Sequence, residues 1–166
     1  PVDTPGELCT RGFLVMMGYF EMPDATAATI DRDGWLHTGD LCTMDSRGYC
    51  RITGRLKDMI IRGGENIYPR EIEEIIYTHP DIADVAVIGI ADDYWGEEVA
   101  AIVRFEVNRS VAGEQLQRFV GTQLARHKVP KHWFALSEIP TTASGKLQKF
   151  KLVEQHRAGE LDGARI

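Results

Sequence analysis

The chain has 166 residues and a formal net charge of −6, and 43% of its residues are hydrophobic. This length suits one ordinary domain, or a small domain joined to a piece of another. The mild acidic charge argues against a general nucleic-acid binder, which needs basic residues to neutralise phosphates. No apolar run approaches the roughly 18 residues that a membrane span requires. The first residues resemble no signal peptide and lack an initiator methionine, so we expect the chain to begin inside a longer protein.

The three cysteines, Cys9, Cys42 and Cys50, are an odd set without CxxC spacing. Disulfide frameworks and zinc sites usually show paired spacings. We therefore expect reduced cysteines that behave as small hydrophobic residues, no metal site, and a cytoplasmic protein.

Up to Gly54 the sequence is rich in strand patterns but has too few apolar residues for a core of its own. The pattern predicts strands over residues 6–20 and 35–41, a short helix over 25–30, and a hairpin turn at 45–48. This part of the chain is therefore expected to be the edge of a larger sheet.

After Gly54 the pattern predicts a small α+β domain. A hairpin is expected around Gly63-Gly64, and Pro69 suits the first position of a helix that stops before Pro80. The other expected elements are strands over 82–90, 97–105 and 133–136, a helix with Ser110 as N-cap, a loop over 141–146, and a last helical segment over 150–156. This order predicts two helices that cover a mixed or antiparallel sheet of about three strands, beside the short hairpin. The tail from Gly159 is expected to fray.

Two residues of the first part are candidates for contacts with a nucleotide. Asp40 follows Gly39 at a strand end, where its carboxylate could accept two ribose hydroxyls, although short motifs of this kind are more often plain turns. Arg55 carries a guanidinium that suits hydroxyl or phosphate contacts. A surface arginine paired with a nearby acid is the simpler local interpretation.

Later candidates also have two interpretations each. Gly63-Gly64 could let a thin ligand pass close to the backbone, or serve the hairpin turn alone. The loop Thr141–Lys146 lacks the glycine pattern of a P-loop, but its lysine could stabilise negative charge near a phosphate; a solvated basic loop is the alternative. The basic run Arg126–Lys131 suits either phosphates or a helix C-terminus. Trp95 could stack on a base or be an exposed aromatic edge.

The order and spacing of these motifs are more specific than any one of them. In chain order they are Gly6–Gly12, Gly18-Tyr19, Gly34–Asp40, Gly54–Asp58, Gly63–Glu73, Lys128–Lys131 and Ser144–Lys146. From about residue 6 to 155 the sequence closely resembles the adenylate-forming enzymes: acyl-CoA synthetases, peptide-synthetase adenylation domains and luciferases. Two segments, Lys57–Pro69 and Gly145–Leu152, look most like medium-chain fatty-acid–CoA ligases.

The resemblance implies a ligase that works in two steps. ATP and a carboxylic acid, here expected to be a fatty acid, give an acyl-adenylate and pyrophosphate; the CoA thiol then attacks the adenylate and AMP leaves. ATP, CoA and Mg²⁺ are the implied cofactors, with the metal site in a large domain upstream. Residues 1–56 would be the β-rich end of that domain, residues 57–158 the C-terminal lid domain, and residues 159–166 a tail. The chain alone is therefore expected to be inactive.

The resemblance also implies roles for single residues. Asp40 and Arg55 would hold the ribose of ATP, and Lys146 would reach the carboxylate and the α-phosphate in the first step. Lys57 stands at the family's hinge position, about which the lid would rotate between steps. The residues that would contact CoA are Gly63, Gly64, Glu65, Trp95 and Lys128.

Three other interpretations remain open. A peptide-synthetase adenylation domain should be followed by a carrier domain, and residues 147–166 show no start of one. A luciferase-like oxygenase would use the same lid. A non-catalytic α+β binding module would be expected to lose some of Asp40, Arg55 and Lys146. The sequence indicates neither the acyl chain length nor the oligomeric state.

Overall fold

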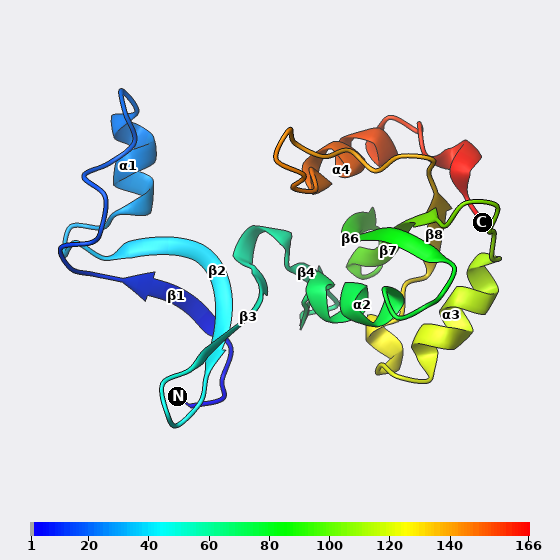
Figure 1. Ribbon diagram of the computed structural model, residues 1–166, viewed down its shortest axis with the longest axis horizontal. Coiled ribbons are helices and arrows are strands. Elements are labelled where there is room, and N and C mark those ends of the chain that lie inside the picture. Colours follow the sequence, from blue (N-terminus) through cyan, green and yellow to red (C-terminus); the bar gives the residue numbers. More distant parts are fainter. Residues whose placement is uncertain (1) are drawn as a thin grey trace. The chain divides into compact units, whose positions relative to one another are not determined.

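The computed structural model describes residues 2–166, and the chain forms two compact units, one ending at Lys57 and the other beginning at Asp58 (Figure 1). Each unit has its own sheet. Among residues 2–166, no helix combines the length and the apolar character needed to cross a membrane.

The first unit is a three-stranded antiparallel sheet with one short helix. Strands β1 (Gly6–Thr10), β2 (Leu36–Met44) and β3 (Cys50–Arg55) pair in that order, and α1 (Pro23–Thr29) precedes β2. The predicted hairpin turn joins β2 to β3: the Asp45 N–H donates to the Tyr49 carbonyl oxygen, and the Asp45 carboxylate accepts from the N–H groups of Arg47 and Tyr49. Buried hydrophobic residues are few here, Leu41 and Cys42 among those described, as expected for a sheet edge.

The predicted strand over residues 6–20 is wrong beyond Thr10. Residues 12–22 form bends and turns, and Leu14 and Met17 are exposed. Gly18 explains part of the difference: its φ is +153°, and a Cβ there would lie 2.8 Å from Thr26. The positive φ at Gly18 departs from the backbone conformation of a strand, and the exposed apolar side chains have no sheet to pack on, so the apolar composition alone misled the prediction.

The second unit has a five-stranded mixed sheet. Strands β4 (Ile60–Arg62) and β5 (Glu65–Ile67) form a hairpin, β6 (Ile82–Asp92) and β7 (Gly96–Phe105) form a long antiparallel pair, and β8 (His132–Ala135) pairs parallel to β7. The hairpin joins the rest of the sheet where Arg62 pairs with Gly96. The predicted α+β class, with a hairpin beside a three-stranded sheet, is confirmed.

Both faces of this sheet are covered by helices. Helices α2 (Pro69–Ile76) and α3 (Gly113–Gly121) pack on one face, and α4 (Lys149–Arg157) packs on the other (Figure 1). Successive residues of β6 alternate between the two cores: Val85 and Val87 face α2 and α3, whereas Ala86 and Ile88 face α4. Two covered faces explain why β6 and β7 are mostly apolar instead of alternating with polar residues.

Two further predictions differ from the structure. Helix α3 begins at Gly113 with Ala112 as N-cap, so Ser110 does not cap it. The tail does not fray, because Leu161 is only 2% exposed within the core under α4 and the Ile166 N–H donates to the Trp133 carbonyl oxygen. A Cβ at Gly113 would lie 2.5 Å from the Ile166 carbonyl oxygen, so only glycine at this helix start leaves room for the end of the chain.

Candidate active site

In the first unit, the two predicted nucleotide contacts stand side by side. Asp40 and Arg55 are register partners in the β2–β3 pair, and Arg55 Nε lies 2.9 Å from Asp40 Oδ1. The side chains are 29% and 54% exposed, so this ion pair lies at the surface. The arrangement fits the simple interpretation of a paired surface arginine, and it equally presents an anion and a guanidinium together to a ligand.

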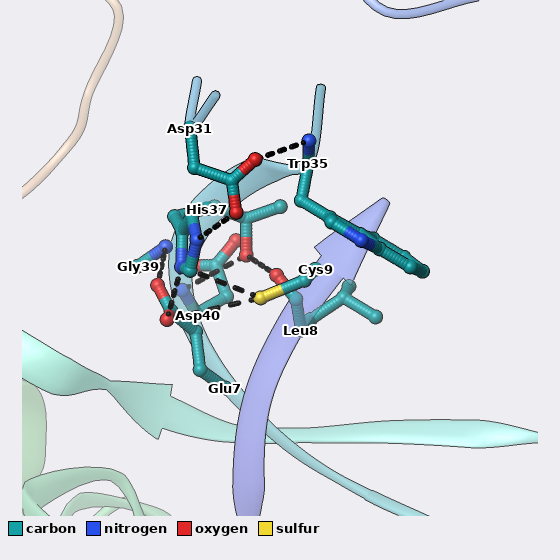
Figure 2. A network of polar contacts seen from close by, with 9 residues as sticks. Glu7, Leu8, Cys9, Asp31, Trp35, His37, Gly39 and Asp40 are labelled. Atoms are coloured by element: carbon teal, nitrogen blue, oxygen red, sulfur yellow. Dashed lines mark hydrogen bonds and ion pairs between the residues drawn. The ribbon is translucent and has the colours of Figure 1, made fainter. Parts of the chain in front are cut away.

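The turn before Asp40 is tied to strand β1 by hydrogen bonds (Figure 2). Glu7 Oε1 accepts the Gly39 N–H at 3.1 Å, and the Thr38 hydroxyl donates to the Leu8 carbonyl oxygen at 2.7 Å. The Thr38 oxygen also accepts the Asp40 N–H at 3.1 Å. These contacts hold Gly39, whose φ is +70°, in the left-handed region that orients Asp40.

Glu7 also forms an ion pair that no local sequence motif predicts. Glu7 Oε2 lies 2.9 Å from His37 Nδ1, and Asp31 Oδ2 lies 3.5 Å from His37 Nε2. The His37 hydrogen bond lowers the pKa of Glu7, and the Glu7 and Asp31 carboxylates raise the pKa of His37. Cys9 lies beside them, and its thiol pKa is raised by burial and by the Glu7 charge. Only strand pairing brings these residues together, because about 30 positions separate Glu7 from His37.

In the second unit, the glycine hairpin packs against Trp95. Gly63 (φ +57°) and Gly64 (φ +87°) form the turn between β4 and β5, and the Gly63 N–H donates to the Trp95 carbonyl oxygen at 2.8 Å. A Cβ at Gly63 would lie 2.6 Å from the indole, whereas a Cβ at Gly64 would meet nothing within 4 Å. Gly63 is therefore required by packing and by backbone conformation, and Gly64 by conformation alone.

A buried acid and two cations lie at the base of this hairpin. Arg62 donates from Nε and Nη2 to the two oxygens of Glu98 at 2.6 and 2.9 Å, and Lys131 Nζ lies 3.1 Å from Glu98 Oε2. The Arg62 guanidinium also lies 4.3 Å from the centroid of the Trp95 ring. Burial alone would raise the pKa of Glu98, but the hydrogen bonds from Arg62, Val99 N–H and Lys131 lower it to about 2. The members of this group come from three separate segments, so no local motif predicted it.

The remaining predicted CoA contacts lie close to the start of helix α2, in sequence for Glu65 and in space for Lys128. Glu65 is exposed on β5, just before the helix, and Lys128 Nζ lies 2.8 Å from both carboxylate oxygens of Glu71 in the first turn. Lys128 therefore has a partner within the chain, and Trp95 is packed against Gly63 and Arg62.

Lys146 is exposed in a tight turn that its own neighbours close. The Thr142 N–H donates to the Lys146 carbonyl oxygen at 2.8 Å, and the Lys146 N–H donates to the Thr142 hydroxyl at 3.1 Å. Gly145 takes φ +79° within the turn. The backbone is thus ordered while the lysine side chain extends from it.

The chain just after this turn is anchored by an ion pair. Lys149 Nζ, in the first residue of α4, lies 2.6 Å from Glu73 Oε1 on α2. The same Glu73 oxygen accepts the N–H of Val87 in edge strand β6 at 2.7 Å. One carboxylate therefore covers a strand edge and fixes the start of α4 behind the Lys146 turn.

Lys57 lies in a 3₁₀ turn over Leu56–Asp58 and is the last residue of the first unit. Its side chain is exposed.

This fold and these motifs define a known class of domain. Residues 71–146 match the family model described as the AMP-binding enzyme C-terminal domain. The part of the chain that carries helices α2 and α3, strands β6 to β8 and the Lys146 turn therefore belongs to this family, and the family recognised from the motifs is confirmed.

Individual relatives extend the similarity over most of the chain. YngI of Bacillus subtilis, which bears the name of an acyl-CoA synthetase, is 55% identical over 150 residues, or 90% of this chain and 27% of YngI. Human mitochondrial medium-chain acyl-CoA ligase ACSF2 is 47% identical over 154 residues, or 93% of this chain and 25% of ACSF2. The ATP-bound crystal structure of MatB from Rhodopseudomonas palustris has a TM-score of 0.87 at 36% identity, covering 95% of this chain and 31% of MatB. The chain thus spans about a quarter of the length of the curated relatives it matches.

The contrast between the two hairpin glycines gives a first prediction. Alanine at Gly64 should cost only the left-handed backbone, about 1–2 kcal/mol. Alanine at Gly63 should cost a further 1–3 kcal/mol or so, because its Cβ would overlap the Trp95 ring. Urea unfolding of Gly63→Ala and Gly64→Ala compares the two, and equal destabilisation would show that Trp95 does not pack as described.

The buried acid gives a prediction about pH. The folded pKa of Glu98, about 2, is lower than its ordinary value of 4.5, so its stabilisation is complete above pH 4.5 and disappears as the pH falls toward 2. Glu98→Gln should lower the free energy of unfolding at pH 7 by about 3 kcal/mol, since it leaves Arg62 without an anionic partner.

The control for this experiment is Glu106→Gln, at an exposed position just after β7. As the pH is lowered from 5 to 2, the free energies of unfolding of the wild type and of the Glu106 variant should fall toward that of the Glu98 variant. A difference that stays constant with pH would contradict the assignment.

Proposed function

We propose that this chain acts as part of an AMP-forming acid–thiol ligase, an acyl-CoA synthetase. The enzyme would use ATP to convert a carboxylic acid, expected to be a fatty acid, into an acyl-adenylate, and would then transfer the acyl group to CoA. The observation that carries the proposal is that one compact unit, which contains the matched family segment, holds both the exposed Lys146 turn and the glycine hairpin. The names of YngI and ACSF2 support the ligase class, and that of ACSF2 supports a fatty acid.

In the first step the chain would contribute charge and hydrogen bonds. The Asp40 carboxylate would accept the ribose hydroxyls of ATP, and Arg55 would contact the same ribose from the neighbouring strand. Lys146 would reach the carboxylate and the α-phosphate, where a positive charge stabilises the negative charge that builds up as the new bond forms. Mg²⁺ would accompany the ATP phosphates, and we assign no residue of this chain to it.

In the second step, backbone that carries no side chain would leave room for CoA to approach, whereas a charged side chain would obstruct it. The open side of Gly64 would let the pantetheine arm of CoA approach the hairpin, with Glu65 next to it. Trp95 and Lys128 would contact the nucleotide part of CoA, and Lys128 would have to leave or share its ion pair with Glu71.

The two steps need different parts of the second unit, so we propose that this unit rotates between them. Lys57 would be the pivot, which is supported by its position at the boundary between the two compact units. Domain closure and hinge motion of this kind commonly assemble a site only for the step that needs it.

The other interpretations have less support. No relative named above is a peptide synthetase. A non-catalytic module would be expected to lose some of Asp40, Arg55 and Lys146, and all three are present. McbA from Marinactinospora thermotolerans, whose structure title names an amide bond synthetase, has a TM-score of 0.83 at 35% identity, so CoA is not the acceptor named in every similar structure. An amine in place of the CoA thiol is therefore the alternative acceptor for the second step.

The role of Lys146 is tested in the longer enzyme that contains this chain. Lys146→Ala should lower the rate of adenylate formation by at least about a hundredfold, because a charge that acts in the transition state is lost. Thioester formation from supplied acyl-adenylate should change far less. Lys151→Ala, an exposed lysine in α4, is the matched control, and equal loss in both steps would refute the assignment.

The dependence on an upstream domain is tested with the 166-residue chain itself. We expect no ATP–pyrophosphate exchange, because the resemblance puts the phosphate-binding loop and the acyl pocket outside these residues. Exchange above the background of a Lys146→Ala chain would overturn this part of the proposal.

A further inference from the structure

Three potential metal ligands meet where β1 pairs with β2 (Figure 2). Cys9 Sγ lies 3.5 Å from His37 Nδ1 and 3.8 Å from Glu7 Oε2, and the last two atoms are 2.9 Å apart. A thiol, an imidazole and a carboxylate thus converge on one point. The cluster has no role in the proposed ligase chemistry.

Strand geometry explains why the sequence did not reveal this group. Glu7 and Cys9 are two positions apart on β1, so their side chains lie on the same face. Cys9 is the register partner of His37 on β2, and Glu7 Oε2 reaches the same ring although the register shift places Glu7 opposite Leu41. The three residues share no local motif, and cysteine spacing alone predicted no metal site.

The three separations fit the corners of a tetrahedral zinc site. With Zn–S near 2.3 Å and Zn–N or Zn–O near 2.0–2.1 Å, neighbouring ligand atoms in a tetrahedron lie about 3.3–3.6 Å apart. The observed values of 2.9, 3.5 and 3.8 Å bracket this range, so side-chain adjustment of a few tenths of an ångström suffices. No strand needs to move.

The far side of the imidazole is already arranged as in metal sites. Asp31 Oδ2 lies 3.5 Å from His37 Nε2, and the other oxygen of Asp31 accepts the N–H groups of Asp33 and Trp35 at 2.9 Å each. A fixed carboxylate on the second ring nitrogen orients a ligating histidine and selects the tautomer that leaves Nδ1 for the metal. Asp31 would act in this way on His37.

We propose that Glu7, Cys9 and His37 bind a Zn²⁺ ion, with the fourth position open to water. Thiolate and imidazole ligands favour Zn²⁺ over Mg²⁺, which prefers oxygen. Glu7 would bind through Oε2 and keep its Oε1 hydrogen bond to the Gly39 N–H, so the ion would brace the turn that orients Asp40. The His37 side chain is 41% exposed, which gives the ion a path from solvent.

The test uses the natural protein that contains this chain, stripped of metal with a chelator. Co²⁺, which reports thiolate ligation by a charge-transfer absorption band, is titrated and then displaced with Zn²⁺. We expect one equivalent to bind with this band and no competition from Mg²⁺. Cys9→Ser should abolish the band, whereas Cys50→Ser, the matched control at an exposed cysteine of β3, should keep it.

A second variant separates ligation from folding. Asp31→Asn should keep the band but weaken Zn²⁺ affinity about 10- to 100-fold, as loss of an outer carboxylate does. If Cys9→Ser fails to fold, protection of Cys9 from alkylation by added Zn²⁺ in the wild type replaces it. Absence of a thiolate band and of this protection, or a band that survives Cys9→Ser in folded protein, would overturn the proposal.

Discussion

The second unit depends on a buried carboxylate, Glu98, which is only 2% exposed and lies between two cations where strand β4 joins β7. Glu98 receives two hydrogen bonds from Arg62 and an ion pair from Lys131, so strand β4 is fixed to β7 where just one register pair joins them. Burying charge is expensive unless partners compensate for lost hydration, and here three donors do so. Because Arg62 also lies over the ring of Trp95, the same group supports the packing that leaves no room for a side chain at Gly63.

The rest of the second unit is a rigid base for exposed turns. Its sheet is buried on both faces, and Glu73 closes one strand edge while holding Lys149 at the start of α4. The Lys146 turn and the glycine hairpin are therefore short, hydrogen-bonded segments attached to well-packed strands and helices. Placing reactive groups on loops of a rigid scaffold is how proteins usually combine precise positioning with access for substrates.

The sequence predicted what depends on local chemistry. Two glycines marked the hairpin, Pro69 marked the start of α2, and long apolar runs marked β6 and β7. The predictions were wrong where contacts between residues far apart in the sequence determine the structure. The apolar residues after Thr10 suggested a strand, yet residues 12–22 form bends and turns, and Leu14 and Met17 are exposed. The tail was predicted to fray, yet the side chain of Leu161 is buried in the core under α4. For the candidate site, the family's motifs predicted single residues. The partners of these residues could not be predicted, because they depend on which strands pair and in what register.

We propose that the hairpin and the Lys146 turn serve different steps of one reaction. Rapid-mixing measurement of each half-reaction in the longer enzyme carrying Gly64→Ala tests it most directly, because this substitution adds a methyl group on the open side of the hairpin and meets nothing within the chain. We expect adenylate formation at the wild-type rate and acyl transfer to CoA slowed at least about tenfold. Equal slowing of both half-reactions, or no slowing of transfer, would contradict it.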